Sequence, residues 1–229
     1  YVITENINVF RESNSDGEHS WLNIESGTEL QFYGGKRLYI GHDYGGSGWW
    51  GGIQAEGVTF TAFSEGVENR WGGITFYNKS WDQDTVSNYI KNSYFENGFS
   101  NHLIAASPYF RGVTFTGFDD AILCESGSHP TVIHSTFSDN IDAIFADGGS
   151  QPTVSYNTFT NNVRPVHIYA YMIDNNLYGN SYSDNAKDYI EVPGGHLNGN
   201  KTYRWLEDGA PYVITENINV FRESNSDGE

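Results

Sequence analysis

Pairs of carboxylate side chains recur 22 residues apart in the middle of this chain, and they are the residues best suited to chemistry. Asp120 is followed at this spacing by Asp142, and Glu125 is followed by Asp147. If a repeated fold stacks these positions, each pair lies about 5 Å apart, close to the separation used when two carboxylates cleave a glycosidic bond with retention. Such pairs repel, so one partner must have a raised pKa, bind a cation or point into water.

The sequence around these carboxylates lacks the partner groups of a complete catalytic site. Arg164 stands 22 residues after Asp142, which favours a surface ion pair between the two over catalysis. A catalytic assignment requires a nucleophile, a base and a stabilising group in mutual reach, and the pattern supplies no such set. We therefore predict no catalytic residues and no required cofactor.

An acidic segment near the start of the chain is a candidate calcium site. Residues 12–17 read ESNSDG, in which oxygen-bearing side chains alternate before a glycine, as in the first half of a calcium-binding loop. Two departures count against it, because Glu12 replaces the usual Asp and Asn23 stands where a bidentate Glu is expected. A solvated loop tip is the alternative. The same six letters recur at residues 223–228. The candidate ligands in the two copies are Glu12, Asn14, Asp16, Glu223, Asn225 and Asp227.

The spacing of the carboxylates comes from a repeat of 22 residues that runs without gaps over residues 106–171. Its three copies align prolines, threonines, phenylalanines and aliphatic residues: Pro108, Pro130, Pro152; Thr114, Thr136, Thr158; Phe115, Phe137, Phe159; Ile122, Ile144, Val166. Short apolar and polar alternations separated by Gly, Asn and Pro predict strands too short to be helices. Three strands per repeat would form one coil of an all-β solenoid, a β-helix.

A ladder of aromatic residues extends the coil pattern on both sides of the repeat. Its expected rungs are Phe95, Phe115, Phe137, Phe159 and Tyr182. Asn140, Asn162 and Asn185 each follow a rung by three residues. We expect these asparagines to adopt the left-handed conformation at a bend and to hydrogen-bond one another along the solenoid. Cys124, the only cysteine, aligns with Ala146 and Ile168 and is expected to be a small core residue.

The two ends of the chain carry the same eighteen residues. Residues 1–18 are repeated letter for letter at residues 212–229, an offset of 211 residues. We interpret residues 1–211 as one unit of a tandem array and residues 212–229 as the start of the next. The alternative is an artificial duplication, or one that only gives the last coil a strand to pair with, and both would still place the second copy as a cap on the exposed end. Residues 212–220 should continue the coil stack beyond Trp205, in the role that residues 1–9 play at the start. Val213 and its neighbours should then be buried, within this chain or against the next copy.

Composition excludes some partners. Twelve Lys and Arg residues face 29 Asp and Glu residues, and the net charge of −17 argues against nucleic acid, whose phosphates need clustered cations. No apolar run approaches the length of a membrane span. The seven histidines show no close pairing with one another or with the cysteine, so zinc is not expected.

The coil segments resemble the right-handed parallel β-helix repeat domains of bacterial secreted and surface proteins. The resemblance rests on YVITENINV, IESGTELQF, KRLYIG, IQAEGVTFTAF, WGGITF and PTVSYNTFTNN, and it covers nearly the whole chain. It implies a single-stranded, right-handed parallel β-helix. It does not imply one activity, because lyases, hydrolases, adhesins and inert spacers share these coils. The acidic-polysaccharide lyase and hydrolase signatures are incomplete, since Arg164-Pro165 and Asp119-Asp120 stand without their partner motifs.

These features predict a structural, non-catalytic unit of an extracellular or cell-surface fibre, stalk, adhesin or surface layer. Its partners would be neighbouring copies of the same unit, joined end to end through the duplicated segment. The alternative is a carbohydrate-active enzyme or carbohydrate-binding module that uses the loops at residues 10–22 and 78–85, with a polysaccharide as partner. Trp81 in the second loop is the best candidate for an exposed sugar contact.

Overall fold

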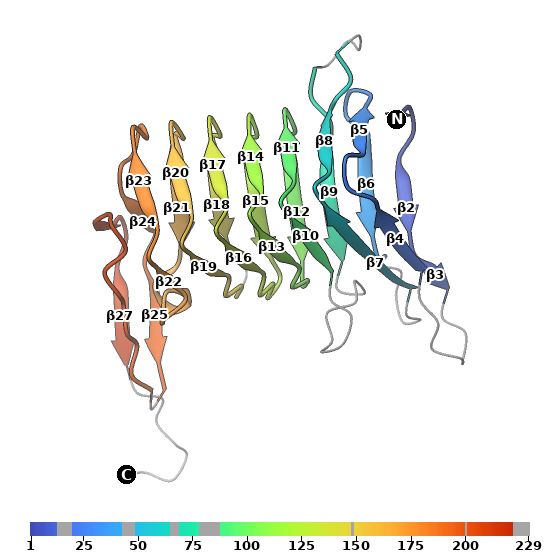
Figure 1. Cartoon of the computed structure of the whole chain (residues 1–229). Helices are drawn as coiled ribbons and strands as arrows, with labels where there is room; N and C mark the ends of the chain where they lie inside the picture. The colour runs from blue at the N-terminus through green and yellow to red at the C-terminus, as the bar shows by residue number, and fades with distance from the viewer. Residues whose placement is uncertain are drawn as a thin grey trace.

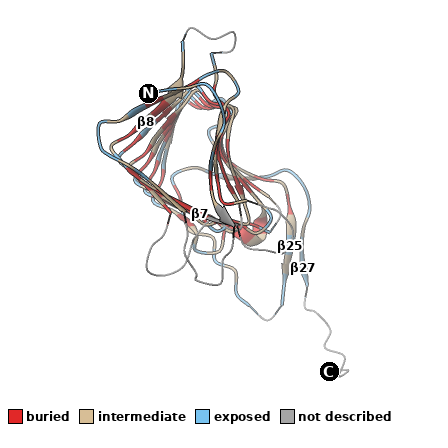
Figure 2. Cartoon of the chain, turned by 90° about the vertical axis from the view of Figure 1, so that its right-hand side faces the viewer, coloured by how far each residue is buried: buried red, intermediate tan, exposed pale blue. Residues whose placement is uncertain are grey.

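A computed structural model shows a right-handed parallel β-helix whose coils stack along one axis (Figure 1). The structure describes residues 1–12, 20–42, 49–64, 69–77, 88–147, 149–199 and 201–221, apart from the side chains of Arg11, Glu12, Trp49 and Trp50. Seen along the axis, three walls of strands enclose a core of buried residues (Figure 2). No helix in the described ranges is long and apolar enough to cross a membrane.

Each wall is a sheet of short strands, one from each coil. Sheet A contains β1 (Val2–Ile3), β5 (Glu29–Phe32), β8 (Thr59–Ala62), β11 (Tyr94–Glu96), β14 (Thr114–Thr116), β17 (Thr136–Ser138), β20 (Thr158–Thr160) and β23 (Ser181–Ser183). Sheet B contains β2 (Ile7–Val9), β6 (Arg37–Ile40), β9 (Gly73–Tyr77), β12 (Ser100–Ile104), β15 (Asp120–Glu125), β18 (Asp142–Ala146), β21 (Arg164–Ile168), β24 (Ile190–Val192) and β26 (Tyr212–Ile214).

The third wall, sheet C, is less regular at its N-terminal end. It contains β3 (Arg11–Glu12), β4 (Ser20–Ile24), β7 (Trp49–Glu56), β10 (Tyr89–Lys91), β13 (Tyr109–Arg111), β16 (Thr131–Ile133), β19 (Thr153–Ser155) and β22 (Leu177–Tyr178). Among the described strands, only β3 pairs antiparallel, with β7. A 3₁₀ turn, η1 (Ala170–Met172), follows β21, and β25 (Gly195–Asn198) pairs with β27 (Ile218–Phe221) outside the three walls (Figure 2).

The expected aromatic ladder fills the core beneath sheet A. Phe95, Phe115, Phe137, Phe159 and Tyr182 are directly paired from strand to strand, and Phe60 adds a rung before them. The rings of Phe115, Phe137 and Phe159 are stacked with centroids 4.9 and 5.0 Å apart. Cys124 is fully buried, as the sequence indicated, and Trp71 is fully buried as well. Because strand residues alternate between the two faces, these rungs point inward while the threonines beside them point outward.

A ladder of asparagine side chains lines the bend between sheets A and B, also as expected. The backbone N–H of Asn140 donates to Oδ1 of Asn162 (3.1 Å), and the N–H of Asn162 donates to Oδ1 of Asn185 (3.0 Å). The expected left-handed conformation falls one residue earlier, at Asp139, Asn161 and Asp184, with φ of 58°, 55° and 57°. The asparagines therefore satisfy buried backbone groups, while the residue before each of them makes the bend.

The aromatic ladder yields a stability prediction. Phe137→Ala should lower the free energy of unfolding by about 3–5 kcal/mol, because it opens a cavity in a fully packed stack. Thr136→Ala, on the outer face of the same strand, should change it by no more than about 0.5 kcal/mol. Denaturant titration of both variants measures the difference. Equal midpoints would show that the ladder does not carry the core.

Candidate functional site

The stacked carboxylates lie on the outer face of sheet B, where the repeat spacing placed them. Asp120 pairs in register with Asp142, and Asp142 with Arg164. The Arg164 guanidinium binds both carboxylate oxygens of Asp142, with Nη2 2.7 Å from Oδ2. It also lies 3.2 Å from Nδ1 of His167 and 3.6 Å from a carboxylate oxygen of Glu191. The expected ion pair is confirmed, and it is the centre of a larger charged network.

Asp120 differs from its stacked partner. Among the described residues no hydrogen bond reaches its carboxyl group, whereas Asp142 is neutralised by arginine. Partial burial, followed by the negative charges of Asp142 and Asp119, raises the pKa of Asp120 to about 6. Asp120 is therefore protonated at mildly acidic pH. Of the three outcomes expected for stacked carboxylates, this pair shows the raised pKa of one partner.

The second expected pair, Glu125 and Asp147, is divided between two environments. Glu125 contacts the preceding coil, where its Oε2 lies 2.8 Å from Nε2 of His102. Asp147 instead lines a groove of about 720 Å³. Nearby, Asp119 pairs with Arg70 at 2.9 Å, and Lys187 pairs with Glu191 at 2.8 Å. Most charges on this face are therefore occupied by neighbours within the chain.

The groove lies between the outer face of sheet B and the two-stranded β25–β27 extension. Its lining combines carboxylates, aromatic rings, an imidazole and amides: Asp147, Tyr169, Tyr171, His196, Glu216, Asn217 and Asn219. The rings of Tyr169 and Tyr171 are stacked with centroids 6.1 Å apart. Burial, followed by the charges of Asp147 and Glu216, raises the pKa of Tyr169. This chemistry suits a polar ligand with hydroxyl groups and an apolar face.

The sequence did not reveal this groove, because its residues come from four separate segments. Tyr169 and Tyr171 flank the start of η1, and His196 belongs to β25. Glu216, Asn217 and Asn219 belong to the second copy of the opening segment. Their first-copy equivalents have other roles: Glu5 pairs with Lys36 at 3.2 Å, and Oδ1 of Asn6 accepts from the Arg37 N–H at 3.0 Å.

The second copy adds a strand to the last coil, as expected, but not in the role of the first copy. In the first copy, β1 pairs with β5 in sheet A and β2 pairs with β6 in sheet B. In the second copy, β26 pairs with β24 in sheet B, and β27 pairs with β25 outside the walls. The expectation that identical residues take one structural role is therefore wrong. The expected burial is met only in part within this chain: Val213 and Ile218 are half-buried, whereas Ile214 is 52% exposed and Val220 78%.

A second asparagine ladder contains Asn157 and Asn180, since the Asn157 N–H donates to Oδ1 of Asn180 at 2.8 Å. Two aspartates close the two ladders at the C-terminal end of the stack. Oδ1 of Asp188 accepts hydrogen bonds from the N–H and Nδ2 of Asn185 at 2.9 and 3.0 Å. The buried Asp208 does the same for Asn180, and it also accepts from the Tyr182 hydroxyl at 2.6 Å. A carboxylate suits this place because it accepts several bonds and has no N–H of its own to satisfy.

The candidate calcium ligands lie outside what the structure describes. Asn14, Asp16, Glu223, Asn225 and Asp227 fall outside the described ranges, and the side chain of Glu12 is not described. Trp81 and the loop at residues 78–85 lie outside them as well. Within the described ranges, no three His, Cys, Asp or Glu side chains gather closely enough to hold a metal ion. Calcium binding stays a prediction.

Comparison with known proteins agrees with the fold. The sequence model of a family described as "Right handed beta helix region" matches residues 72–204, more than half of the chain. No curated protein and no solved structure matches the chain significantly.

The raised pKa of Asp120 predicts a pH-dependent stability. The pKa of Asp120 is higher in the folded than in the unfolded protein, so the folded state favours the protonated carboxyl group. The contribution of this group to the free energy of unfolding is therefore fully present below about pH 4 and is lost as the pH rises through about 6. Asp120→Asn should therefore unfold less readily than the unchanged protein at pH 7, by about 1 kcal/mol once solvent screening is allowed for. The two proteins should converge near pH 4. Denaturant titration at several pH values measures this.

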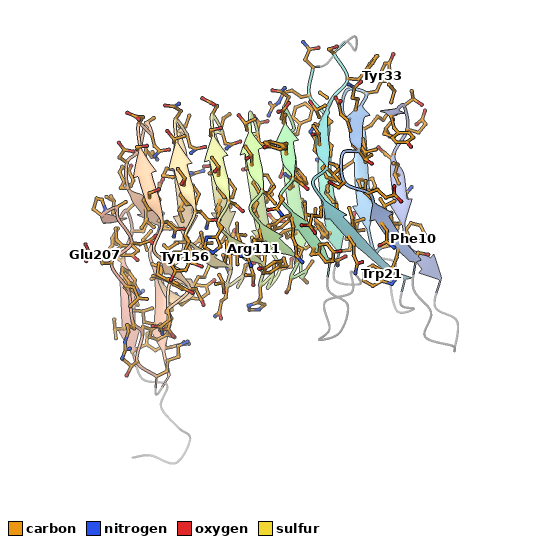
Figure 3. The ribbon with its side chains drawn as sticks, viewed as in Figure 1. Phe10, Trp21, Tyr33, Arg111, Tyr156 and Glu207 are labelled. Carbon is orange, nitrogen blue, oxygen red and sulfur yellow. The ribbon has the colours of Figure 1, made fainter. Side chains whose placement is uncertain are left out.

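The matched control is Glu207→Gln, which removes an exposed carboxylate at the end of the stack opposite Phe10 and Trp21 (Figure 3). It should leave the pH dependence unchanged. A pH profile of Asp120→Asn that is parallel to that of the unchanged protein would contradict the assignment.

Proposed function

Because this chain belongs to the right-handed β-helix family, whose coils are a scaffold rather than an activity, we propose that it is a structural, non-catalytic repeat unit of an extracellular or cell-surface protein. The units form a fibre, stalk, adhesin or surface layer by stacking end to end. The observation that carries the proposal is the pairing of β26 with β24, which adds the second copy of the opening segment to the end of sheet B.

The interior of the stack supports a mechanical role. Backbone hydrogen bonds between coils run along the axis through all three walls, and the Phe and Asn ladders repeat the same contacts from coil to coil. In such a solenoid each coil is stabilised by its neighbours, so rigidity extends over the length of the stack. The net charge of −17 keeps such an object soluble and repels polyanions.

The outer face of sheet B supports a non-catalytic interpretation. Asp142, Glu125 and Asp119 each bind a basic side chain, and Asp120, unpaired among the described residues, has a raised pKa of about 6. Neither Asp120 nor Asp142 lines the large groove. Asp120 stacks on Asp142, whose carboxylate is held by Arg164, so the pair offers no free second group for acid–base or nucleophilic catalysis.

Binding of a neutral saccharide is a second candidate function, favoured by the groove beside Tyr169 and Tyr171. Tyrosine rings offer a face for the C–H groups of a sugar ring, and the carboxylates and amides accept or donate to its hydroxyls. Asp147 and Glu216 would repel an acidic polysaccharide, so the ligand class is neutral. A second, adjoining groove shares Tyr171 and His196 and adds Lys201 and Tyr203, which lengthens the binding surface.

The stacking proposal predicts the shape of a longer chain. A protein made of residues 1–211 followed by residues 1–229 should be a stiff rod, about 40 Å longer than the 229-residue chain, because the 211 added residues contribute eight strands to sheet B, from β2 to β24, at about 4.8 Å each. Small-angle X-ray scattering measures the added length. A control with Gly-Ser sequence in place of residues 212–221 at the junction should lose stiffness. Two bodies moving independently in the unaltered two-unit chain would contradict the proposal.

The saccharide candidate predicts binding that depends on one tyrosine. Calorimetric titration with neutral oligosaccharides should show binding that Tyr171→Ala weakens by at least tenfold. The matched control is Tyr156→Ala, an exposed tyrosine in the turn directly after β19 that stacks on His134 with centroids 5.3 Å apart (Figure 3). It should leave the affinity unchanged. Equal loss in both variants, or no binding to any neutral glycan, would remove this candidate.

A further inference from the structure

The two copies of the opening segment use different edges of the same strands. In parallel sheets the backbone groups of successive residues point to opposite edges, so each strand can bind one neighbour on each side. In the first copy, the carbonyls of Tyr1 and Ile3 accept from the N–H groups of Gln31 (2.8 Å) and Tyr33 (2.9 Å). Residues 1 and 3 therefore face β5.

In the first strand of the second copy, the residues of the other parity bind the neighbouring strand. The Pro211 carbonyl accepts from the Ile190 N–H at 3.0 Å, and the Thr215 N–H donates to the Val192 carbonyl at 3.0 Å. Residues 211, 213 and 215 therefore face β24. Tyr212 and Ile214, the equivalents of Tyr1 and Ile3, direct their backbone groups to the other edge, the one that β5 covers in the first copy.

The second strand of each copy follows the same rule. In the first copy the Val9 carbonyl accepts from the Gly41 N–H at 3.0 Å, so residues 7 and 9 face β6. In the second copy the Asn217 carbonyl accepts from the Gly195 N–H at 3.2 Å, so residues 217, 219 and 221 face β25. The equivalents of residues 7 and 9 are 218 and 220, and they face the open edge. Among the described residues, neither strand has a partner on the edge that the first copy uses.

Side-chain exposure agrees with the backbone. Val9 is 8% exposed beneath its neighbours, whereas its equivalent Val220 is 78% exposed. Ile214, the equivalent of the half-buried Ile3, is 52% exposed. These apolar side chains lack the cover that residues 29–32 and 37–40 give to the first copy.

We propose that β26 and β27 form the docking edge for the first coil of a further copy of this unit, with that copy's Glu29–Phe32 segment on β26 and its Arg37–Ile40 segment on β27. This inference rests on the proposed function and adds its geometry. The register follows from the first copy: Val213 lies opposite Gln31 of the next unit and Ile214 opposite its Phe32, while Ile218 lies opposite Leu38.

The geometry implies that neighbouring units are offset sideways. Sheet B of one unit continues as sheet A of the next, and the next sheet B begins from β25 and β27, which project beyond the three walls (Figure 2). Continuation of sheet A as sheet A would require a strand on β23. That end is closed instead, because Asp208 accepts from Tyr182 and Gly209 lies against the backbone of Asn180.

The test opens the receiving edge in the full chain by changing only the first copy. Ile3→Asp with Ile7→Asp should release β1 and β2, leaving β5 and β6 free to bind residues 212–221 of a neighbouring molecule. Sedimentation should then show the weight-average mass at least doubling with rising concentration. The same changes in the second copy, Ile214→Asp with Ile218→Asp, should leave a monomer. All four changes together should also leave a monomer.

A cysteine pair reports which sheet receives the strand. Added to the first-copy variant, Val213→Cys with Gln31→Cys should form a disulfide between molecules, since neighbouring parallel strands place such residues about 4.8 Å apart. Cys124 is buried and does not compete. Val213→Cys with Tyr39→Cys tests the straight continuation of sheet B, because Tyr39 and Glu191 lie in one outward row of that sheet. Crosslinking at residue 39 and not at residue 31 would overturn the offset.

A peptide makes the result independent of oligomer formation. A synthetic peptide of residues 1–10 should bind the first-copy variant and return it to a monomer, whereas a peptide with both Asp changes should not. If the double change unfolds the first coils, Ile3→Asp alone releases β1, keeps β2 on β6 and should give the same residue-31 crosslink. A folded variant that neither associates nor binds the peptide would overturn the inference. The two-unit rod measurement would still decide the proposed function by itself.

Discussion

The structure depends on one constraint, which is that each coil completes the hydrogen bonds of the coil before it. At the bends the chain cannot form sheet, so its buried N–H groups would be left unpaired at a cost of about 1–3 kcal/mol each. Side chains from the following coil accept these bonds, as Asn162 does for Asn140 and Ser150 does for Ser128. A coil is therefore finished only when another one follows it.

This dependence explains the residues at the C-terminal end of the stack. Asn185 and Asn180 have no further asparagine to receive their N–H groups, and Asp188 and Asp208 take that place. Asp208 lies in the segment between β25 and β26, and it also accepts a hydrogen bond from Tyr182, the last rung of the aromatic ladder. At two of the three bends, an aspartate therefore accepts the last unpaired N–H groups of the stack. Sheet B, in contrast, is extended by β26.

The sequence predicted the coils well because period and side-chain alternation determine them. The 22-residue repeat alone was enough to locate the Phe and Thr rows, the asparagine ladder and the Asp142–Arg164 contact. It could not predict Asp208, whose contact with Asn180 spans 28 residues and breaks the period. Nor could it locate the groove at Tyr169 and Tyr171, because His196 and Glu216 reach it only after the chain leaves the coil pattern.

The failed expectation for the duplicated segment shows what alternation does and does not determine. Alternation fixes which side chains share a face. It leaves open which neighbour binds each edge, because a strand has two edges and residues of one parity serve each. In the first copy, residues 1, 3, 7 and 9 bind the coil that follows them. The second copy comes after a completed coil, and it binds the strands before it through residues of the opposite parity. One decapeptide can therefore join two successive solenoids, because its odd-numbered and even-numbered residues serve different neighbours; here it extends sheet B of the first unit through β24 and would enter the next unit on the sheet A strand that β5 provides.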